Sequence, residues 1–166
     1  MIDLASALHA YLTQAHDETW PVLTRLGPED LETEIYSGEE AGWKVRDVLA
    51  HLADAERGLL GQIRRMVAGG QTVPNDFDLN RWNRSAVRKR AGRTPEELLD
   101  ELQQAHEEVL AFLSTLQEKD FDHVGRHASG EMLSTEGYFR RMADHRREHV
   151  SDISRALGGS ARRRTP

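Results

Sequence analysis

The residues of this chain best suited to chemistry are two histidines near its C-terminal end. His145 and His149 stand four residues apart in the string His145-Arg146-Arg147-Glu148-His149. On an α-helix four residues turn about 400°, so the two imidazoles lie about 40° apart on one face. This arrangement suits two ligands of one divalent ion. The alternative is that His149 fills a core position while His145 is solvated, and the pair alone leaves both interpretations open.

The same string matches the H-x-x-E-H pattern of the inverted zincins, in which Glu148 would activate a water on the zinc ion. A protease of that kind takes a further glutamate ligand from well downstream, and no glutamate follows Glu148 in this chain. We therefore exclude the protease. Glu148 is kept as the candidate catalytic base, with pairing to a nearby arginine as its alternative role.

A third histidine, His51, lies in the apolar stretch His51-Leu52-Ala53 of a predicted helix. A histidine that faces a core must satisfy both ring nitrogens. One nitrogen could bind a metal while the other donates to Asp47 or Asp54, which lie on the same side of the helix. The alternative is a buried histidine that is hydrogen-bonded to a neighbouring helix.

Helical periodicity predicts the elements that carry these residues, because apolar side chains recur at steps of three or four. The predicted long helices cover residues 4–26, 45–67, 95–116 and 135–157. Pro21 should kink or interrupt the first. The clearest start is the capping box Thr94-Pro95-Glu96-Glu97, and the predicted stops are Gly69-Gly70 and Gly158-Gly159.

Four long amphipathic helices predict an all-α four-helix bundle, with long connecting loops and a short extra helix that starts after Asp78, before the third long helix. We expect one domain over residues 1–158 and a flexible basic tail over residues 159–166. The connections over 27–42 and 117–133 exceed the usual bundle loops, so they either cross over the bundle or carry function.

Composition narrows the class of protein. Lys and Arg number 22 and Asp and Glu 28, for a net charge of −6, which argues against a nucleic-acid partner. No cysteine is present, so disulfides and thiolate nucleophiles are excluded. The first residues do not form a signal peptide, and no apolar run approaches the length of about 18 residues that spans a membrane. We expect a soluble, cytoplasmic protein.

Two motifs carry a family resemblance. The segment over 42–52, GWKVRDVLAHL, followed far downstream by His145-x-x-Glu148-His149, resembles the DinB/YfiT superfamily over most of the chain. The resemblance implies a four-helix bundle whose metal site takes one histidine from the second long helix and two from the last. The matching positions are His51, His145 and His149. Lys44 departs from the family pattern, in which a threonine usually caps the second helix.

The stretch around Trp82-Asn83 is similar to the mycothiol-dependent maleylpyruvate isomerase and ClbS-like branches. The resemblance implies a divalent ion (Zn, Ni, Fe or Mn) and either hydrolysis of a small molecule or transfer with a low-molecular-weight thiol. It also implies a homodimer. Two alternatives stay open: a ClbS-like hydrolase that detoxifies electrophiles without metal, and a non-enzymatic, stress-related binding bundle.

The other histidines carry weaker expectations. His9 and His16 share a face of the first helix and are expected in solvent rather than at the rim of the site. His106 is expected at the surface of the third long helix. His123 and His127 fall in the last long loop, where they either belong to a lid or are solvated.

Overall fold

The computed structural model describes residues 3–35 and 41–163 of the chain, and the side chains as far as residue 158. Residues 36–40, within the predicted loop over 27–42, lie outside the described residues. So do residues 164–166 of the predicted tail. Within the described residues no helix is both long enough and apolar enough to cross a membrane.

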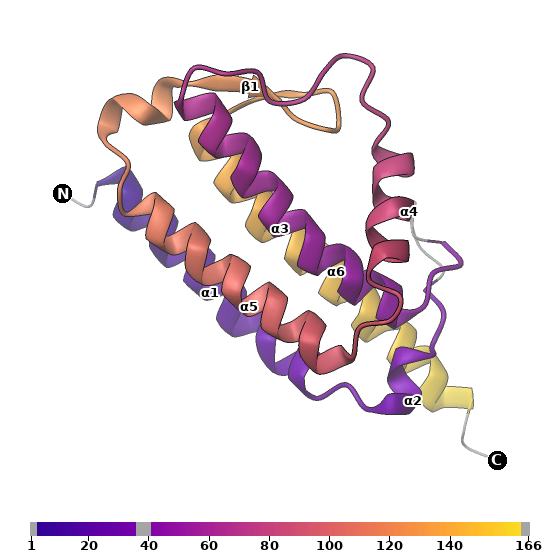
Figure 1. Cartoon of the computed structure of the whole chain (residues 1–166). Coiled ribbons are helices and arrows are strands. Elements are labelled where there is room, and N and C mark those ends of the chain that lie inside the picture. The colour runs from indigo at the N-terminus through magenta and orange to yellow at the C-terminus, as the bar shows by residue number, and fades with distance from the viewer. Residues whose placement is uncertain (1–2, 36–40, 164–166) are drawn as a thin grey trace.

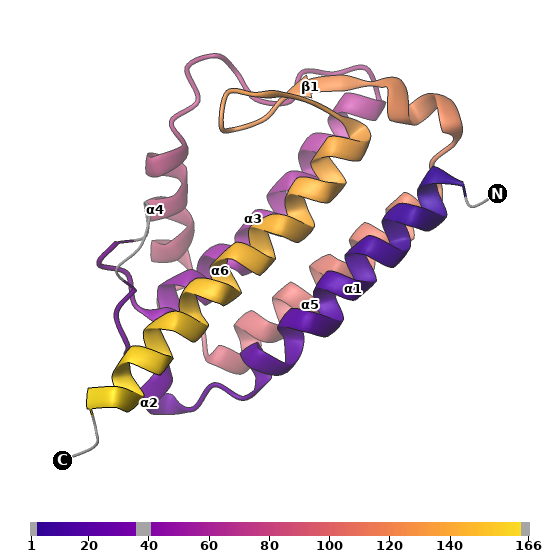
Figure 2. The ribbon, with the colours of Figure 1, turned by 180° about the vertical axis from the view of Figure 1, so that it is seen from behind.

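Four long helices form the bundle (Figure 1): α1 (Leu4–Thr24), α3 (Val45–Val67), α5 (Pro95–Leu113) and α6 (Thr135–Arg163). Helices α1 and α3 each pack against both α5 and α6, so α1 and α3 lie diagonally opposite each other. Figures 1 and 2 show that α1 and α6 run in one direction and that α3 and α5 run in the other. The predicted all-α four-helix bundle is confirmed.

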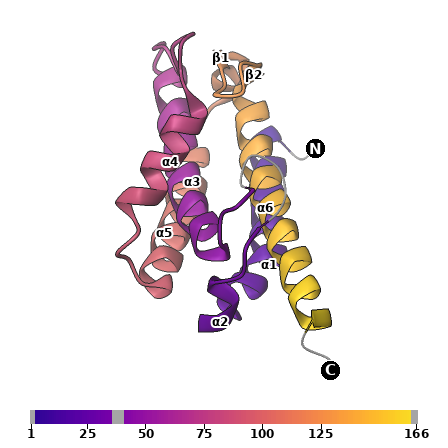
Figure 3. The same cartoon turned by 90° about the vertical axis from the view of Figure 1, so that its right-hand side faces the viewer.

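The long connections follow from this topology. Because the neighbouring helices α3 and α5 are parallel, the chain between them has to travel back along the bundle. Helix α4 (Leu79–Lys89) lies in this return segment beside α3, as Figure 3 shows. It is the predicted short helix, and it begins where the Asp78 carboxylate accepts a hydrogen bond from the Arg81 backbone N–H at 2.9 Å.

The other connections contain more structure than predicted. The first holds a one-turn helix, α2 (Pro28–Leu31), and a bridge between Glu34 and Lys44. The last, expected to be loop, holds the 3-10 helix η2 (Glu118–Asp122) and two antiparallel strands, β1 (Val124–Arg126) and β2 (Met132–Ser134). Gly130 turns the chain between the strands at a φ of 92°, a value that favours glycine. This hairpin covers the end of the bundle where α6 begins (Figure 2).

Most predicted helix starts are confirmed, but two predicted breaks are wrong. Thr94 and Glu97 form their capping box, with contacts of 3.2 and 2.8 Å. Helix α1 continues through Pro21, and α6 continues beyond Gly158–Gly159 to Arg163. A glycine ends a helix by entering the left-handed region, as Gly69 does after α3 at a φ of 82°. Gly158 has no positive φ, so the helix does not stop there.

The core is divided into two apolar clusters along the bundle axis. One lies toward the hairpin and contains Leu8, Leu60 and Tyr138, which are 0–1 % exposed. The other lies toward α2 and contains Leu49 and Ile153, which are equally buried. His145 lies between the two clusters on α6, and His51 lies beside the second cluster on α3.

Candidate metal centre

The structure brings together the three histidines whose ligand role the family resemblance implied. The Nε2 atom of His145 lies 3.1 Å from Nε2 of His51 and 3.0 Å from Nε2 of His149. His51 comes from α3, and His145 and His149 come from successive turns of α6. Two helices that pack against each other therefore aim three ring nitrogens at one point.

The triad consists of neutral rings. Burial, and after it the neighbouring His149 ring, lower the pKa of His51 to about 3. Burial and the other two rings hold the pKa of His145 well below its ordinary value of 6.5. Burial also lowers the pKa of His149. Near neutral pH all three rings therefore carry the unprotonated nitrogen that a metal ion requires.

The donor set fits a divalent ion. Two imidazole nitrogens that bind one ion at about 2.1 Å lie about 3.0–3.4 Å apart, for coordination angles between about 90° and 109°. The two separations from His145, 3.0 and 3.1 Å, agree with this range, and all three ligand atoms lie within 4.8 Å of one another. In the part of the chain that the structure describes, these rings form the one cluster of three or more His, Asp or Glu side chains that could share an ion.

The predicted carboxylate partners of His51 are wrong. Asp47 accepts a hydrogen bond from the Lys44 backbone N–H at 2.9 Å, at the start of α3. Asp54 accepts from Trp82 Nε1 at 3.0 Å and from Arg90 at 2.8 Å. The Nδ1 atom of His51 is buried and has no hydrogen-bond partner among the described residues. Helix spacing placed the acids on the correct side of α3, but stronger donors hold them.

Glu148, the candidate catalytic base, lies on the outer face of α6. Its side chain is 58 % exposed, and its two oxygens accept hydrogen bonds from Arg141 Nη1 at 3.0 and 3.2 Å. This is the arginine pairing that was the alternative for Glu148. Its role as a base stays a prediction, because the carboxylate is within one turn of both α6 ligands but is engaged with Arg141.

A second group of polar side chains, the buried polar layer, lies on the other side of the α3–α6 contact. It consists of one residue from each bundle helix: His16, Glu56, His106 and Arg146. Arg146 Nε donates to Glu56 Oε1 at 2.6 Å, and its Nη1 lies 2.7 Å from His16 Nδ1. The His16 ring stacks on His106 with centroids 4.1 Å apart. The layer therefore contains its own cation, the guanidinium of Arg146.

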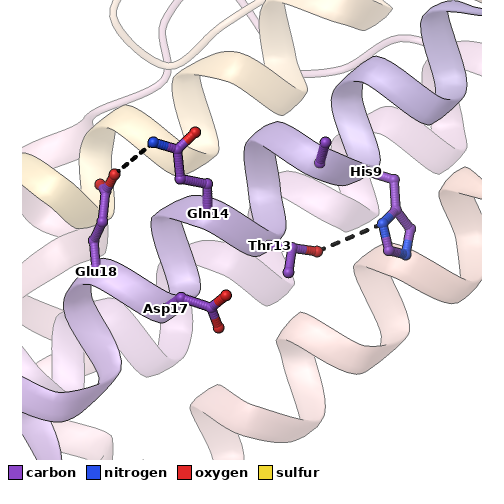
Figure 4. A pocket seen from close by; sticks show the side chains of 6 residues that line it. His9, Thr13, Gln14, Asp17 and Glu18 are labelled. Carbon is purple, nitrogen blue, oxygen red and sulfur yellow. Dashed lines mark hydrogen bonds between the residues drawn. The ribbon is translucent and has the colours of Figure 1, made fainter. Parts of the chain in front are cut away.

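The remaining histidines lie apart from the triad's ring nitrogens. His9 is exposed on the outer face of α1, where Figure 4 shows it beside Thr13 at a shallow depression. His106 is only 7 % exposed, so the predicted surface position is wrong. His16 is half-buried, although solvent exposure was expected. His127 is buried under the hairpin, and its Nδ1 accepts a hydrogen bond from the Ser129 backbone N–H.

Sequence reasoning missed Arg141 and the buried polar layer. Arg141 precedes His145 by four residues and Glu148 by seven, so all three lie near one another on α6. This spacing could have predicted Arg141 as a neighbour of both residues. The layer had a signal too. Glu56, His106 and Arg146 each occupy a position within the apolar stripe of their helix, where a polar residue requires a partner.

Comparison with known proteins agrees with this geometry. The family model described as the DinB superfamily matches residues 11–153. A search of the curated proteins finds none that matches. One similar solved structure is YfiT from Bacillus subtilis, titled "a probable metal-dependent hydrolase with an unusual four-helix bundle topology"; it is 20% identical with a TM-score of 0.77, over 97% of this chain and 91% of that one.

A second similar structure is the mycothiol-dependent maleylpyruvate isomerase. It is 12% identical with a TM-score of 0.76, and the match covers 90% of this chain but 60% of the isomerase. This chain therefore matches somewhat more than half of the isomerase's length. At these identities both structures establish a shared fold, which is the bundle with parallel neighbouring helices described above.

Proposed function

The chain belongs to the DinB superfamily, and we propose that it is a divalent-metal-dependent enzyme that acts on a small molecule. His51, His145 and His149 would hold the ion. The observation that carries the proposal is the convergence of three neutral Nε2 atoms, with contacts of 3.0 and 3.1 Å, from two packed helices.

The protein supplies the ligands, their protonation state and their fixed positions. Burial keeps the rings unprotonated, and because they are neutral they leave the charge of a divalent ion uncompensated. When bound, such an ion supplies Lewis-acid chemistry: it lowers the pKa of water and polarises a carbonyl group. The Trp43 ring packs against the His51 ring in an edge-on contact, with the ring centroids 5.6 Å apart, and this contact restricts the position of His51.

We propose hydrolysis as the reaction, with Glu148 as the base that accepts a proton from the attacking water. YfiT, which shares the fold, is titled a metal-dependent hydrolase, and this supports hydrolysis. The isomerase that shares the fold is mycothiol-dependent. Transfer with a low-molecular-weight thiol is therefore the second candidate, and it would need a thiol from outside because the chain has no cysteine.

The test is elemental analysis of protein purified without a histidine tag. We expect close to one divalent ion per chain in the parent protein and none in the H51A/H145A/H149A variant. His9→Ala/His123→Ala is the matched control, because it removes two histidines outside the triad and should keep the ion. Folded parent protein that binds no zinc, nickel, iron or manganese on addition of each ion would overturn the proposal.

Turnover then separates the alternatives. A metal-loaded parent that hydrolyses members of an ester, amide and lactone panel, with a folded but inactive triad variant, supports metal-dependent hydrolysis. Activity that survives in the triad variant indicates the metal-independent, ClbS-like alternative. Activity that requires an added thiol such as mycothiol indicates transfer.

A further inference from the structure

The ion pair between Arg141 and Glu148 differs from an ordinary helix-surface pair. Side chains on a helix normally pair with a partner three or four residues away. Arg140 does so on the same helix, donating to Glu136 at 2.7 Å. Arg141 and Glu148 are seven residues, or about 10 Å of helix rise, apart, yet their side chains meet at 3.0 Å.

This geometry places the guanidinium beside the triad. To meet across two turns, both side chains have to lie along the helix, and the residues between them are Asp144 and His145. Arg141 therefore lies one helical turn from a triad ligand. Its charge also contributes, after larger causes, to the lowered pKa values of His145, His149 and His127.

A cation at this position opposes the binding of a divalent ion by Coulomb repulsion, which is a cost for the proposed function. The cost is offset while an anion sits on the guanidinium. In the structure that anion is Glu148, whose side chain is 58 % exposed. An exposed pair of this kind is worth about 0.2–1 kcal/mol, so another carboxylate can replace Glu148 at little cost.

The α3 residues on this side of the triad are small. Helices α3 and α6 are antiparallel (Figure 1), so residues that follow His51 on α3 lie on the same side as Arg141. Ala55 and Gly58 come next on the His51 face, and a Cβ added at Gly58 would meet no atom within 4 Å. Farther along the same face, the Oε1 atom of Gln62 is buried with no hydrogen-bond partner among the described residues.

We propose that the substrate of this site carries a carboxylate group, and that Arg141 binds this group in place of Glu148. The proposal rests on the proposed function for the reaction, but the anion site stands on Arg141 and Glu148 alone. Exchange also has a consequence for Glu148. Once its partner is taken, its carboxylate is freed within one helical turn of both α6 ligands.

The experiment titrates benzoate into the full-length protein, in metal-free and in zinc-loaded form, and follows the arginine side-chain N–H signals by NMR. Arg141→Met should weaken benzoate binding at least ten-fold. Arg140→Met is the matched control, since it removes a neighbouring, similarly paired arginine of α6, and it should leave binding unchanged. Benzamide, which is neutral, should not bind.

Glu148→Gln gives a prediction of opposite sign, because it removes the internal competitor for Arg141. Benzoate should bind about two- to five-fold more tightly, the factor that corresponds to an exposed ion pair of about 0.4–1 kcal/mol. A general loss of structure cannot produce this gain. Equal affinity in Arg141→Met and Arg140→Met, or no gain in Glu148→Gln, would overturn the inference. So would the absence of benzoate binding to the parent protein, or inorganic phosphate binding more tightly than benzoate.

The failure of this inference is distinguishable from the failure of the proposed function. If the parent protein binds no zinc but the benzoate results hold in its metal-free form, then the anion site is supported and the metal-dependent function is contradicted. If zinc binds to the triad but benzoate affinity does not depend on Arg141, then the metal-dependent function is supported and the carboxylate substrate is contradicted.

Discussion

Helices α3 and α6 contribute residues to both the triad and the buried polar layer, but the two groups are built differently. Both contain buried histidines whose pKa values are lowered. In the triad three rings aim nitrogens at one another, and charged side chains act from nearby: Arg141 lowers the pKa of His149, whereas Asp152 and Glu148 raise it. In the layer the guanidinium of Arg146 lies between the Glu56 carboxylate and the His16 ring.

The layer supplies its own cation, whereas the proposed metal site would take its cation from outside the chain. His145 and Arg146 are adjacent in sequence, so their side chains leave α6 in directions about 100° apart. The cation of the layer is the Arg146 guanidinium, and the layer fills the height between the two apolar clusters. We infer that the layer fixes the helices and that the triad uses the resulting geometry.

The strongest test of this contrast is Glu56→Ala. It leaves the Arg146 guanidinium buried, at 2 % residue exposure, without its carboxylate partner. Removing one member of a buried ion pair costs about 3–5 kcal/mol of unfolding free energy. For a domain of this size that corresponds to a fall in Tm of about 6–20 °C, to be measured by thermal and urea unfolding.

The matched control for Glu56→Ala is Glu18→Ala. It breaks another ion pair to α6, between Glu18 and Arg147 at 2.7 Å, in which the glutamate is 47 % exposed. Its cost should be small, because a solvent-exposed ion pair contributes little to stability. If Glu56→Ala costs no more than Glu18→Ala, then the layer does not fix the bundle and the contrast with the triad fails.

The second test adds zinc and measures stability. A ligand that binds only the folded chain stabilises it by about 2.7 kcal/mol at a free concentration 100 times its Kd. We expect this gain in the parent protein and in His106→Gln, whose change lies in the layer, and none in His145→Ala. If zinc still stabilises His145→Ala, then the triad does not bind the ion. If zinc no longer stabilises His106→Gln, then the binding depends on the layer, which also contradicts the proposal.

The sequence predicted the triad better than the layer for a physical reason. His145 and His149 share one helix, so local periodicity alone places them on one face, and the family motif adds His51. The four layer residues lie on four helices. Their meeting depends on which helices are neighbours, and periodicity does not encode that. The same limit explains the long connections: their lengths indicated crossovers, but the parallel pairing of α3 with α5 came only from the structure.

Local chemistry was read correctly where one turn of chain decides the outcome. The capping box at Thr94 and the cap at Asp78 are such cases. The predicted helix end at Gly158 was wrong, because a glycine can continue a helix as well as end it. Prediction also failed for Asp54, whose position beside His51 was predicted but whose partners, Trp82 and Arg90, come from α4.

The smallest expected effect is a pH dependence that belongs to the layer alone. Burial, with contributions from His16, Arg146 and His9, lowers the pKa of His106 to about 3. In the unfolded chain the pKa of His106 is about 6.5, so below that pH His106 binds a proton in the unfolded chain but not in the folded chain. The unfolding free energy is therefore complete above about pH 6.5 and falls with decreasing pH, by at most about 1.4 kcal/mol per pH unit for this ring.

His106→Gln should remove this slope, and urea unfolding at pH 7.5, 6.0 and 5.0 in the presence of a chelator measures it. The triad rings contribute a slope of their own in metal-free protein, so the comparison is between the variant and the parent under identical conditions. The difference in unfolding free energy between the two should be constant above pH 7 and should shrink as the pH falls. An unchanged difference down to pH 5 would mean that His106 is protonated in the folded protein, and the layer would then hold two cations rather than one.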